Sequence, residues 1–381
     1  MKYYFDHTAT SFIEQDVIEF LAEQLINNNY NPAALYTSGI EAAASIAESA
    51  RTIAEILGAE PQEVIITSGA TESINTALKG IVFSPNPKYK RIITSAGEHP
   101  ATNETLKFIS RQLNYTIDYC PLNAKGEVNL TELESLLATN QYDLLTLIHV
   151  NNVLGSVNPL AQIVKLRNQY QPDLPIHLDA VQTLGKIPFN FNKMSIELAS
   201  FSLHKLGGPK GIGILLKDKA TRLEPLIHGG GQQNNLRSGT ENPALVATVA
   251  YILERMHKKI EQNNQVITEL KGFLLEQLKK ESIKHQVISP EDAVPHIISI
   301  AFPELRAETL LNILAREGIE VSIGSACSSK KSERNQVLQE LNLPHGLDQY
   351  VLRISLDKSN SQTEISDLVR IIKTALDKYA V

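Results

Sequence analysis

The sequence predicts an α/β fold: a mostly parallel central sheet with helices on both faces, followed by a smaller C-terminal α+β domain. Short apolar runs bounded by turn residues alternate with amphipathic helical segments through the first two thirds of the chain. Polar side chains directly follow several of these runs. Because open α/β sheets bind ligands at the carboxyl ends of their strands, the pattern also predicts a single ligand crevice there.

The first strand–turn–helix units lie in the amino-terminal third. Apolar residues of segment 41–57 recur at helical spacing, and Gly58 after them is typical of a left-handed cap. The apolar run 64–67 predicts a strand, and Ser68–Ser73 opens a helix toward Lys79. Further strands are expected at 91–95 and 115–119, with a helix starting near Pro100.

The same alternation continues through the middle of the chain. Thr131 and Glu134 have the spacing of a capping box, which predicts a helix start before the next strand. Strands are then expected at 143–150, 176–179, 197–202 and 213–216.

The last third predicts a second, smaller domain. Asn242 and Pro243 are a favourable cap and first helical residue, and a largely helical segment follows toward Lys280. We expect a large domain over 12–255 and a small α+β domain over 256–381, with residues 1–11 packing on the latter. Its expected strands are 297–302, 320–322 and 351–355, and its expected helices are 307–317, 332–341 and 364–379, the last behind a capping box at Ser361 and Glu364.

Composition excludes several classes of protein. The 381 residues are 43% hydrophobic and 20% charged, as in ordinary soluble globular proteins. A net charge of -6 argues against binding a nucleic-acid backbone directly. There is no signal-peptide core and no apolar run of membrane-spanning length, so we expect a cytoplasmic protein without membrane contact. No metal-ligand pattern is evident.

Lys205 is the strongest candidate for chemistry. It follows the expected strand 197–202 and precedes a turn rich in glycine, 207–213, that permits close approach of another group. A lysine desolvated at such a junction has a lowered pKa and can form a Schiff base. The alternative is a solvated lysine in a surface loop.

Several polar residues near other strand ends suit the same site. Small residues in Ser68–Ser73 at a helix start favour phosphate binding, although an ordinary turn is the alternative. Asp179 ends a strand and suits a protonated ring nitrogen, or else caps a helix. His99 could stack on a ring and move protons, although the alternative is a satisfied structural histidine. Arg353 interrupts an apolar strand with a fork that suits a carboxylate, unless it simply faces solvent.

The two cysteines have different surroundings and are too few for a disulfide framework. Cys327 lies in a small and polar run, 322–331, that predicts a loop and an accessible thiol. Cys120 ends a strand before Pro121, and we interpret it as structural.

Together these segments resemble one family, the cysteine desulfurases of the NifS/IscS type in the class V aminotransferase group, which have the pyridoxal-phosphate fold type I. The resemblance covers nearly the whole chain. Its motifs are Tyr4–Thr10, Gly-Ala-Thr-Glu-Ser at 69–73, Glu98-His99, His149–Asn152, His177–Gln182, Ser202-x-His-Lys205 with Gly-Pro-Lys-Gly-Ile-Gly after it, Gly229–Gln232, Arg237–Thr240 and Gly324–Ser328.

The resemblance implies a role for each matching residue. Lys205 would hold pyridoxal 5′-phosphate covalently, Asp179 would pair with its ring nitrogen, Gln182 with its ring oxygen, and His99 would stack on the ring and relay protons. The implied phosphate ligands are Ala70, Thr71, Ser202, His204 and, from a second subunit, Thr240. Asn152 and Arg353 would bind the substrate carboxylate, with Asn152 also touching the cofactor.

The implied activity is conversion of L-cysteine to L-alanine, with the sulfur left on Cys327 as a persulfide. A protein acceptor would then take the sulfur for iron–sulfur cluster assembly or RNA thiolation, and the active site would need both subunits of a homodimer. Two alternatives stay open: a pyridoxal-phosphate lyase that releases sulfide from cysteine or cystine without a persulfide, and a catalytically silent scaffold. Three departures from the family pattern are Tyr36, Val153 and Gln233.

Overall fold

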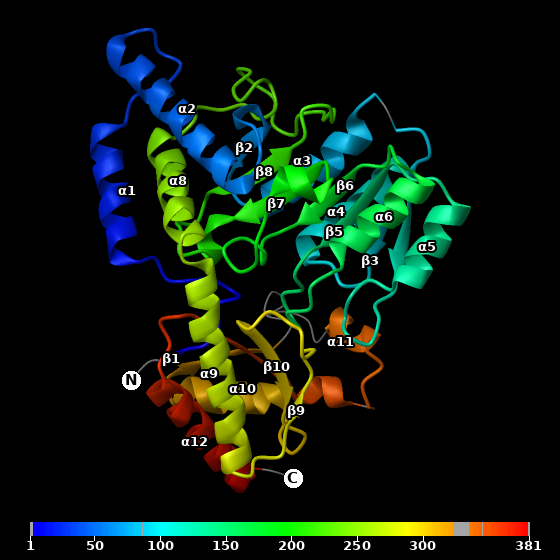
Figure 1. Ribbon diagram of the computed structural model, residues 1–381, viewed down its shortest axis with the longest axis vertical. Coiled ribbons are helices and arrows are strands. Elements are labelled where there is room, and N and C mark those ends of the chain that lie inside the picture. The colour runs from blue at the N-terminus through cyan, green and yellow to red at the C-terminus, as the bar shows by residue number, and fades with distance from the viewer. Residues whose placement is uncertain (1–2, 86, 324–334, 345, 380–381) are drawn as a thin grey trace.

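A seven-stranded sheet organises the computed structural model, which describes residues 3–85, 87–323, 335–344 and 346–379 (Figure 1). Its strands lie in the order β2-β8-β7-β6-β5-β3-β4. All neighbouring pairs are parallel except those that β8 makes with β2 and β7. The bounds are β2 (Val64–Thr67), β8 (Gly213–Lys217), β7 (Leu198–Ser202), β6 (Ile176–Asp179), β5 (Leu144–Ile148), β3 (Arg91–Ser95) and β4 (Thr116–Cys120).

Helices cover both faces of this sheet and each face has its own apolar core. One face packs under α2 (Thr37–Leu57), α5 (Leu130–Thr139), α6 (Leu160–Tyr170) and α8 (Pro243–His257). The other packs under α3 (Ala70–Phe83) and α4 (Pro100–Leu113). Helix α1 (Gln15–Asn27) lies outside, against α8, and the short α7 (Phe191–Met194) contributes Phe191 to the first core. The predicted α/β class and mostly parallel sheet are confirmed.

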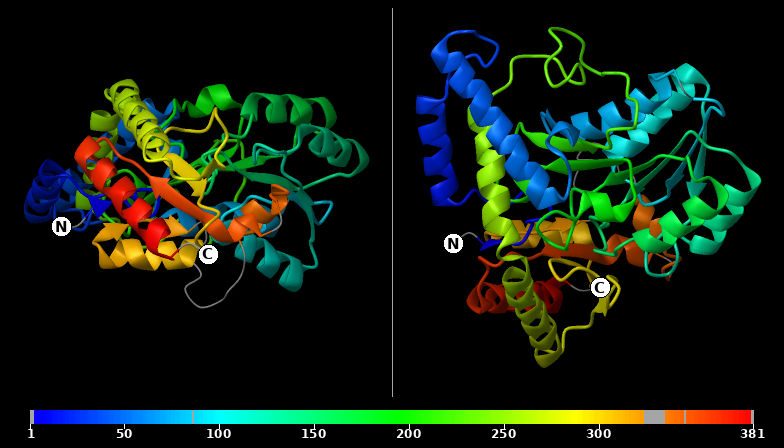
Figure 2. Two further views of the ribbon diagram at one scale, coloured as in Figure 1. Left: turned by 90° about the horizontal axis from the view of Figure 1, so that it is seen from below. Right: turned by 45° about the horizontal axis from the view of Figure 1, so that its top comes forward.

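The carboxyl-terminal part builds a second core on a four-stranded antiparallel sheet. Its strands are β12 (Ser322–Ile323), β13 (Val351–Ser355), β10 (Ile297–Ala301) and β9 (Gln286–Val287). Its helices are α9 (Ile260–Lys280), α10 (Ala307–Arg316), α11 (Gln336–Glu340) and α12 (Gln362–Tyr379). Helix α9 packs against α12, as the views in Figure 2 show.

The amino terminus joins this second core. Strand β1 (Tyr3–Tyr4) pairs in parallel with β11 (Ile319–Glu320), and Phe5 is fully buried among the carboxyl-terminal apolar residues. The chain then crosses to the large sheet. We call residues 6–11 the amino-terminal arm.

Several predicted local details differ from the structure. The capping box at Thr131 and Glu134 is wrong: the Asn129 side chain caps α5 by accepting from the N–H groups of Thr131 and Glu132. The box at Ser361 and Glu364 is confirmed by both of its hydrogen bonds, at 2.8 and 3.2 Å.

Strand and helix boundaries also differ. The single strand expected at 320–322 is wrong. The structure has two short strands, β11 and β12, which are separated by Val321 and belong to different sheets. Helix α2 begins at Thr37 rather than at residue 41, and α1 was not predicted. Gly58 does cap α2 in the left-handed region, with φ of 65°. Of the expected helix 332–341, the described part is α11. No helix in the described ranges is long and apolar enough to cross a membrane.

Gly213 sets how closely β8 approaches the turn before α3. A Cβ atom built on Gly213 would lie 2.6 Å from the Cα of Gly69 and 2.7 Å from the carbonyl oxygen of Phe201. These are main-chain atoms, so neither neighbour can yield without moving the sheet. Only glycine permits this contact between two strands and a helix start.

Replacing Gly213 with alanine should therefore destabilise the protein. We expect a loss of about 1–3 kcal/mol in the free energy of unfolding, because the added methyl group overpacks the strand end. Gly272 in α9 is the matched control, since a Cβ there meets nothing within 4 Å. Gly272→Ala should stabilise by about 0.5–1 kcal/mol through helix propensity. Urea unfolding of both variants checks this, and equal effects would contradict it.

Candidate active site at the strand ends

The candidate site lies at one edge of the seven-stranded sheet. Thr67 at the end of β2 and Ser202 at the end of β7 both pair with Gly213, the first residue of β8. Asp179 ends β6 at the same edge, because β6 runs parallel to β7. Lys205 follows β7 in a short 3-10 helix, Leu203–Lys205. The topology therefore brings the carboxyl ends of these strands together, as predicted.

Asp179 is the buried acid of this edge, with only 3% of its surface exposed. Burial raises the pKa of its carboxyl group, and His99, the Val181 N–H at 3.1 Å and Lys205 oppose that rise. A carboxylate so placed is stabilised by a further cation. The protonated ring nitrogen of pyridoxal phosphate would supply one.

Lys205 is held by main-chain oxygens of the amino-terminal arm. Its Nζ donates to the carbonyl oxygens of Thr8 at 2.9 Å and Ala9 at 2.6 Å. Ser11 donates in turn to the carbonyl oxygen of Lys205 at 3.1 Å. These contacts keep the amine at the strand ends rather than in open solvent. The surface-lysine alternative does not fit this placement.

Gln182 contacts the same arm. Its Nε2 donates one hydrogen to the carbonyl oxygen of Thr8 at 3.1 Å, and only 5% of the residue's surface is exposed. The second hydrogen on Nε2 stays available for an acceptor such as a ring oxygen. This geometry fits the predicted role.

The amino terminus of α3 is ready for an anion. Its N-cap is Gly69, with φ of 149°, and no side chain caps it among the described residues. The free N–H groups of Ala70 and Thr71 therefore face outward with the positive end of the helix dipole. A Cβ atom on Gly69 would lie 3.8 Å from the Ser202 hydroxyl, which places that donor beside the turn.

His204 follows Ser202 by two residues and precedes Lys205 in the same 3-10 helix. Burial, together with the charges of Lys205 and Lys210, lowers the pKa of its imidazole to about 4. Its Nδ1 lies 3.3 Å from the Thr10 hydroxyl. A neutral imidazole at this position can donate one hydrogen to a phosphate oxygen. The residues present thus fit pyridoxal phosphate at its phosphate, its ring nitrogen and its aldehyde.

His99 also caps a helix, a structural role that the sequence analysis did not predict. It is the N-cap of α4, and its Nδ1 accepts the Ala101 N–H at 3.1 Å. This bond fixes the ring and leaves Nε2 as the nitrogen that carries a proton. His99 is therefore oriented at the strand end before any ligand arrives.

Glu98, immediately before His99, is a buried acid that sequence reasoning did not select. Its Oε1 accepts the Ser95 hydroxyl at 2.5 Å and the Ile148 N–H at 2.9 Å, which ties β3 to β5. Its Oε2 has no partner among the described residues. Burial, with the negative charge of Asp179, raises its pKa to about 8 despite these two hydrogen bonds. Only the motif Glu98-His99 hinted at it.

Arg353 lies on β13 and is buried. Its two terminal nitrogens bind the Asp6 carboxylate at 2.8 Å and the carbonyl oxygen of Asn152 at 2.9 Å. Only 4% of its side chain is exposed, so the solvent-facing alternative is wrong. The structure brings together the two residues expected to bind the substrate carboxylate, Asn152 and Arg353. Asp6 is the third residue of this group. The sequence analysis did not select it, because a single acidic residue near the amino terminus has no distinctive pattern.

Two buried histidines, His177 and His149, link neighbouring segments of the large sheet through side-chain hydrogen bonds. His177 on β6 bridges Thr146 at 2.8 Å and Ser200 at 2.9 Å, and His149 lies 3.0 Å from Thr183. Burial lowers the pKa of His177 to about 3 and that of His149 to about 4. Both imidazoles are neutral near pH 7 and serve as hydrogen-bonded links.

Other predicted positions lie elsewhere. Cys327 falls outside the described residues. Cys120 is fully buried with a pKa raised to about 12 by burial, which confirms its structural interpretation. Thr240 is exposed on the loop 229–241. Val153 is 3% exposed in a core shared with α11, β10 and β13, which gives a packing reason for the apolar residue.

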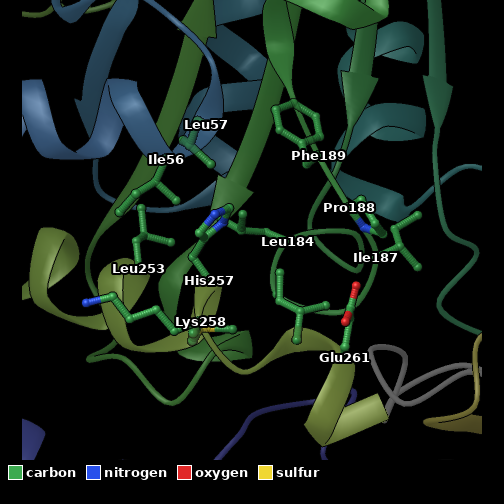
Figure 3. Close-up of a pocket in the computed structure, with 13 residues that line it drawn as sticks. Ile56, Leu57, Leu184, Ile187, Pro188, Phe189, Leu253, His257, Lys258 and Glu261 are labelled. Carbon is green, nitrogen blue, oxygen red and sulfur yellow. The ribbon is translucent and has the colours of Figure 1, made fainter. Parts of the chain in front are cut away.

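A cavity of about 360 Å³ lies away from these residues, where α2, α8 and α9 meet the loop after β6. Figure 3 shows its largely apolar lining, including Leu57, Leu184 and Leu253. None of the predicted cofactor or substrate residues lines it.

Residues 3–368 match the family model described as "Aminotransferase class-V". The chain belongs to this family. It is 35% identical to the cysteine desulfurase IscS of Dictyoglomus turgidum, over 97% of this chain and 94% of that protein. It is 29% identical to the cysteine desulfurase NifS of Azotobacter vinelandii, over 96% and 90%. Within the family, the chain is a cysteine desulfurase of the NifS/IscS type.

Solved structures agree with this assignment. A "NIFS-LIKE PROTEIN" superposes with a TM-score of 0.92 at 33% identity, covering 99% of this chain and all of that one. A structure named "SspA in complex with cysteine" gives a TM-score of 0.82 at 29% identity, covering 95% of this chain and all of that one. The expected fold type I architecture is confirmed.

Glu98 predicts a specific pH dependence of stability. Its pKa is about 8 in the folded protein, against an ordinary value of 4.5. The folded state therefore keeps a proton that the unfolded chain releases, and stability falls as pH rises from 4.5 to 8, by about 1 kcal/mol per pH unit. Glu98→Gln carries no titrating proton and should remove this slope.

The measurement is urea unfolding of the cofactor-free protein at several pH values between 5 and 8. Asp179 stays in both proteins, so the difference between wild type and Glu98→Gln isolates Glu98. An unchanged slope in the variant would contradict the assignment.

Proposed function

We infer that this protein is a pyridoxal-phosphate-dependent cysteine desulfurase, which converts L-cysteine to L-alanine and retains the sulfur as a protein persulfide. The observation that carries this is the convergence of a buried carboxylate, an amine and an uncapped helix start at one sheet edge: Asp179, Lys205 and α3. The family and the desulfurase relatives narrow the reaction to cysteine.

Pyridoxal phosphate, when bound, withdraws electrons from the substrate and so weakens its C–S bond. We propose that Asp179 stabilises the positive ring nitrogen and that Gln182 donates to the ring oxygen. Lys205 would hold the cofactor before the substrate arrives. The phosphate would bind at Ala70, Thr71, Ser202 and His204, with Thr240 added by the partner subunit.

The remaining residues would handle the substrate. Arg353 and Asn152 bind its carboxylate, and Asp6 positions the Arg353 fork. Lys205 and His99 exchange protons with the substrate carbon atoms, since both reach the strand ends. The Cys327 thiolate attacks the substrate sulfur, the C–S bond breaks, and the carbon that loses sulfur gains a proton to give alanine.

The sulfur on Cys327 would pass to an acceptor protein, for iron–sulfur cluster assembly or thiolation. We propose that residues 12–255 carry the cofactor and that 256–381, with the amino terminus, carry Cys327 and Arg353. Separate apolar cores under the two sheets support this division.

Cys327→Ala tests the reaction. A desulfurase should lose alanine production from cysteine by about 100-fold or more, because its sulfur acceptor is gone. A lyase that releases sulfide directly would keep its turnover and form pyruvate. Cys120→Ala is the matched control, since that thiol is fully buried in the core at the end of the edge strand β4 and should leave alanine production unchanged. Alanine and pyruvate are measured in the same reaction.

We also propose a homodimer, through an apolar surface on α1, the segment 28–36 and the start of α2. Large exposed side chains gather there, and Leu35 is 92% exposed. They are Ile18, Leu25, Ile26, Tyr30, Leu35, Tyr36 and Ile40. Soluble monomers rarely expose so many neighbouring apolar groups. A small cavity lined by Asn31, Pro32 and Thr240 joins this surface to the loop that carries Thr240.

Leu35→Asp should disrupt the dimer, because it places a charge in the apolar contact. Light scattering after gel filtration should show a shift toward the monomer mass. Val287→Asp, on the edge strand β9, alters an exposed apolar residue outside this surface and should leave the mass unchanged. A wild-type protein that runs as a monomer at micromolar concentration would contradict the proposal.

A further inference from the structure

Gln233 attaches the loop 229–241 to the edge of the large sheet. Its Oε1 accepts the Ile66 N–H at 2.6 Å, and its Nε2 donates to the Ile66 carbonyl oxygen at 2.9 Å. Ile66 lies on β2, an edge strand whose outer main-chain groups meet no further strand among the described residues. A glutamate at this position could accept but not donate, which gives a physical reason for glutamine here.

Arg237 attaches the same loop to the first turn of α3. Its Nε lies 2.9 Å from Oε1 of Glu72, and its terminal nitrogen lies 3.4 Å from Oε2. The Glu72 carboxylate also accepts the Ser68 N–H at 2.8 Å. The turn 68–71 is therefore held on both sides, by Gln233 where β2 ends and by Arg237 where α3 begins.

The loop is strained where it makes these contacts. Gln233, Asn234 and Asn235 are three consecutive left-handed residues, with φ of 49°, 57° and 64°. Asparagine tolerates this region, but glutamine does so at a cost. Such backbone persists only where surrounding contacts fix it, and it is concentrated at ligand clamps and active sites. Here the contacts that fix it are those to β2 and α3.

Arg237 also balances the negative charge of Glu72. Glu72 is ionised: burial raises its pKa, but hydrogen bonds from Arg237 and Ser68 outweigh burial and lower it. Its side chain is only 9% exposed, and it lies in the helix turn whose N–H groups would bind the phosphate. An unpaired carboxylate there would repel an anion. Arg237 neutralises it.

We propose that Gln233, Arg237 and Glu72 form a phosphate clamp, a set of positioning residues that fixes the turn 68–71 and keeps its charge suited to the cofactor phosphate. This deepens the proposed function and rests on it. None of the three residues needs to touch the cofactor. The loop that carries Thr240 toward the partner subunit would thus also shape the phosphate turn of its own subunit.

Binding of cofactor to the cofactor-free protein tests the clamp. Pyridoxal 5′-phosphate and pyridoxal, which lacks the phosphate, are each titrated and followed by absorbance. Arg237→Gln should weaken binding of the phosphate form by about tenfold or more, because Glu72 is left unpaired beside it, and should leave pyridoxal binding unchanged. The double variant Glu72→Gln with Arg237→Gln should recover most of the loss, since the repelling charge is removed.

Arg91→Gln is the matched control. It breaks an ion pair with Asp118, 2.6 Å long, at the opposite edge of the same sheet, where β3 begins. It should change neither affinity. Should Arg237→Gln fail to fold, Glu72→Gln alone serves: removing its charge should keep or tighten binding of the phosphate form.

The outcomes separate the two proposals. Equal affinities of wild type and Arg237→Gln for pyridoxal 5′-phosphate would overturn the clamp and leave the desulfurase proposal intact. Equal weakening for pyridoxal would also overturn it, because the effect would then not act through the phosphate. A wild-type protein that binds neither ligand would overturn the proposed function itself.

Discussion

A carboxylate removed from water at the end of a central strand is the constraint on which this site depends. Asp179 is almost fully buried, and its charged form needs positive partners. Lys205 supplies one from the end of β7, the strand next to β6, and His99 also opposes the rise of the Asp179 pKa. His99 follows β3, which is separated from β6 by β5. The strands that form the apolar core therefore also set the distances between Asp179, Lys205 and His99.

Helix starts do much of the positioning at this edge. In the part of the chain that the structure describes, α3 begins without a side-chain cap and its first N–H groups stay available, whereas α4 begins with His99 as its cap. The first arrangement leaves donors available, and the second fixes a ring. Gly213 allows the uncapped turn to approach β8. One edge of the sheet thus combines an uncapped helix start, among the described residues, with an imidazole whose orientation is fixed.

The sequence carried strong signals for some of this and none for the rest. The strand-end positions of Asp179 and Lys205 were predictable, because each follows a short apolar run bounded by turn residues. The antiparallel direction of β8 was not, since an apolar strand reads the same either way. The carbonyl oxygens of Thr8 and Ala9 leave no trace in the sequence, because every residue has one. Capping at Asn129 was missed since two neighbouring polar residues mimicked a box.

The amino-terminal arm has a consequence for how the protein is made. Tyr3 pairs with Ile319, and Asp6 pairs with Arg353 across 347 positions, so these early residues must wait for partners that are made much later. The carbonyl groups that hold Lys205 reach their places only when this pairing closes. Because synthesis is vectorial, the strands of the large sheet can pair before these contacts close, so the surroundings of Lys205 are completed late.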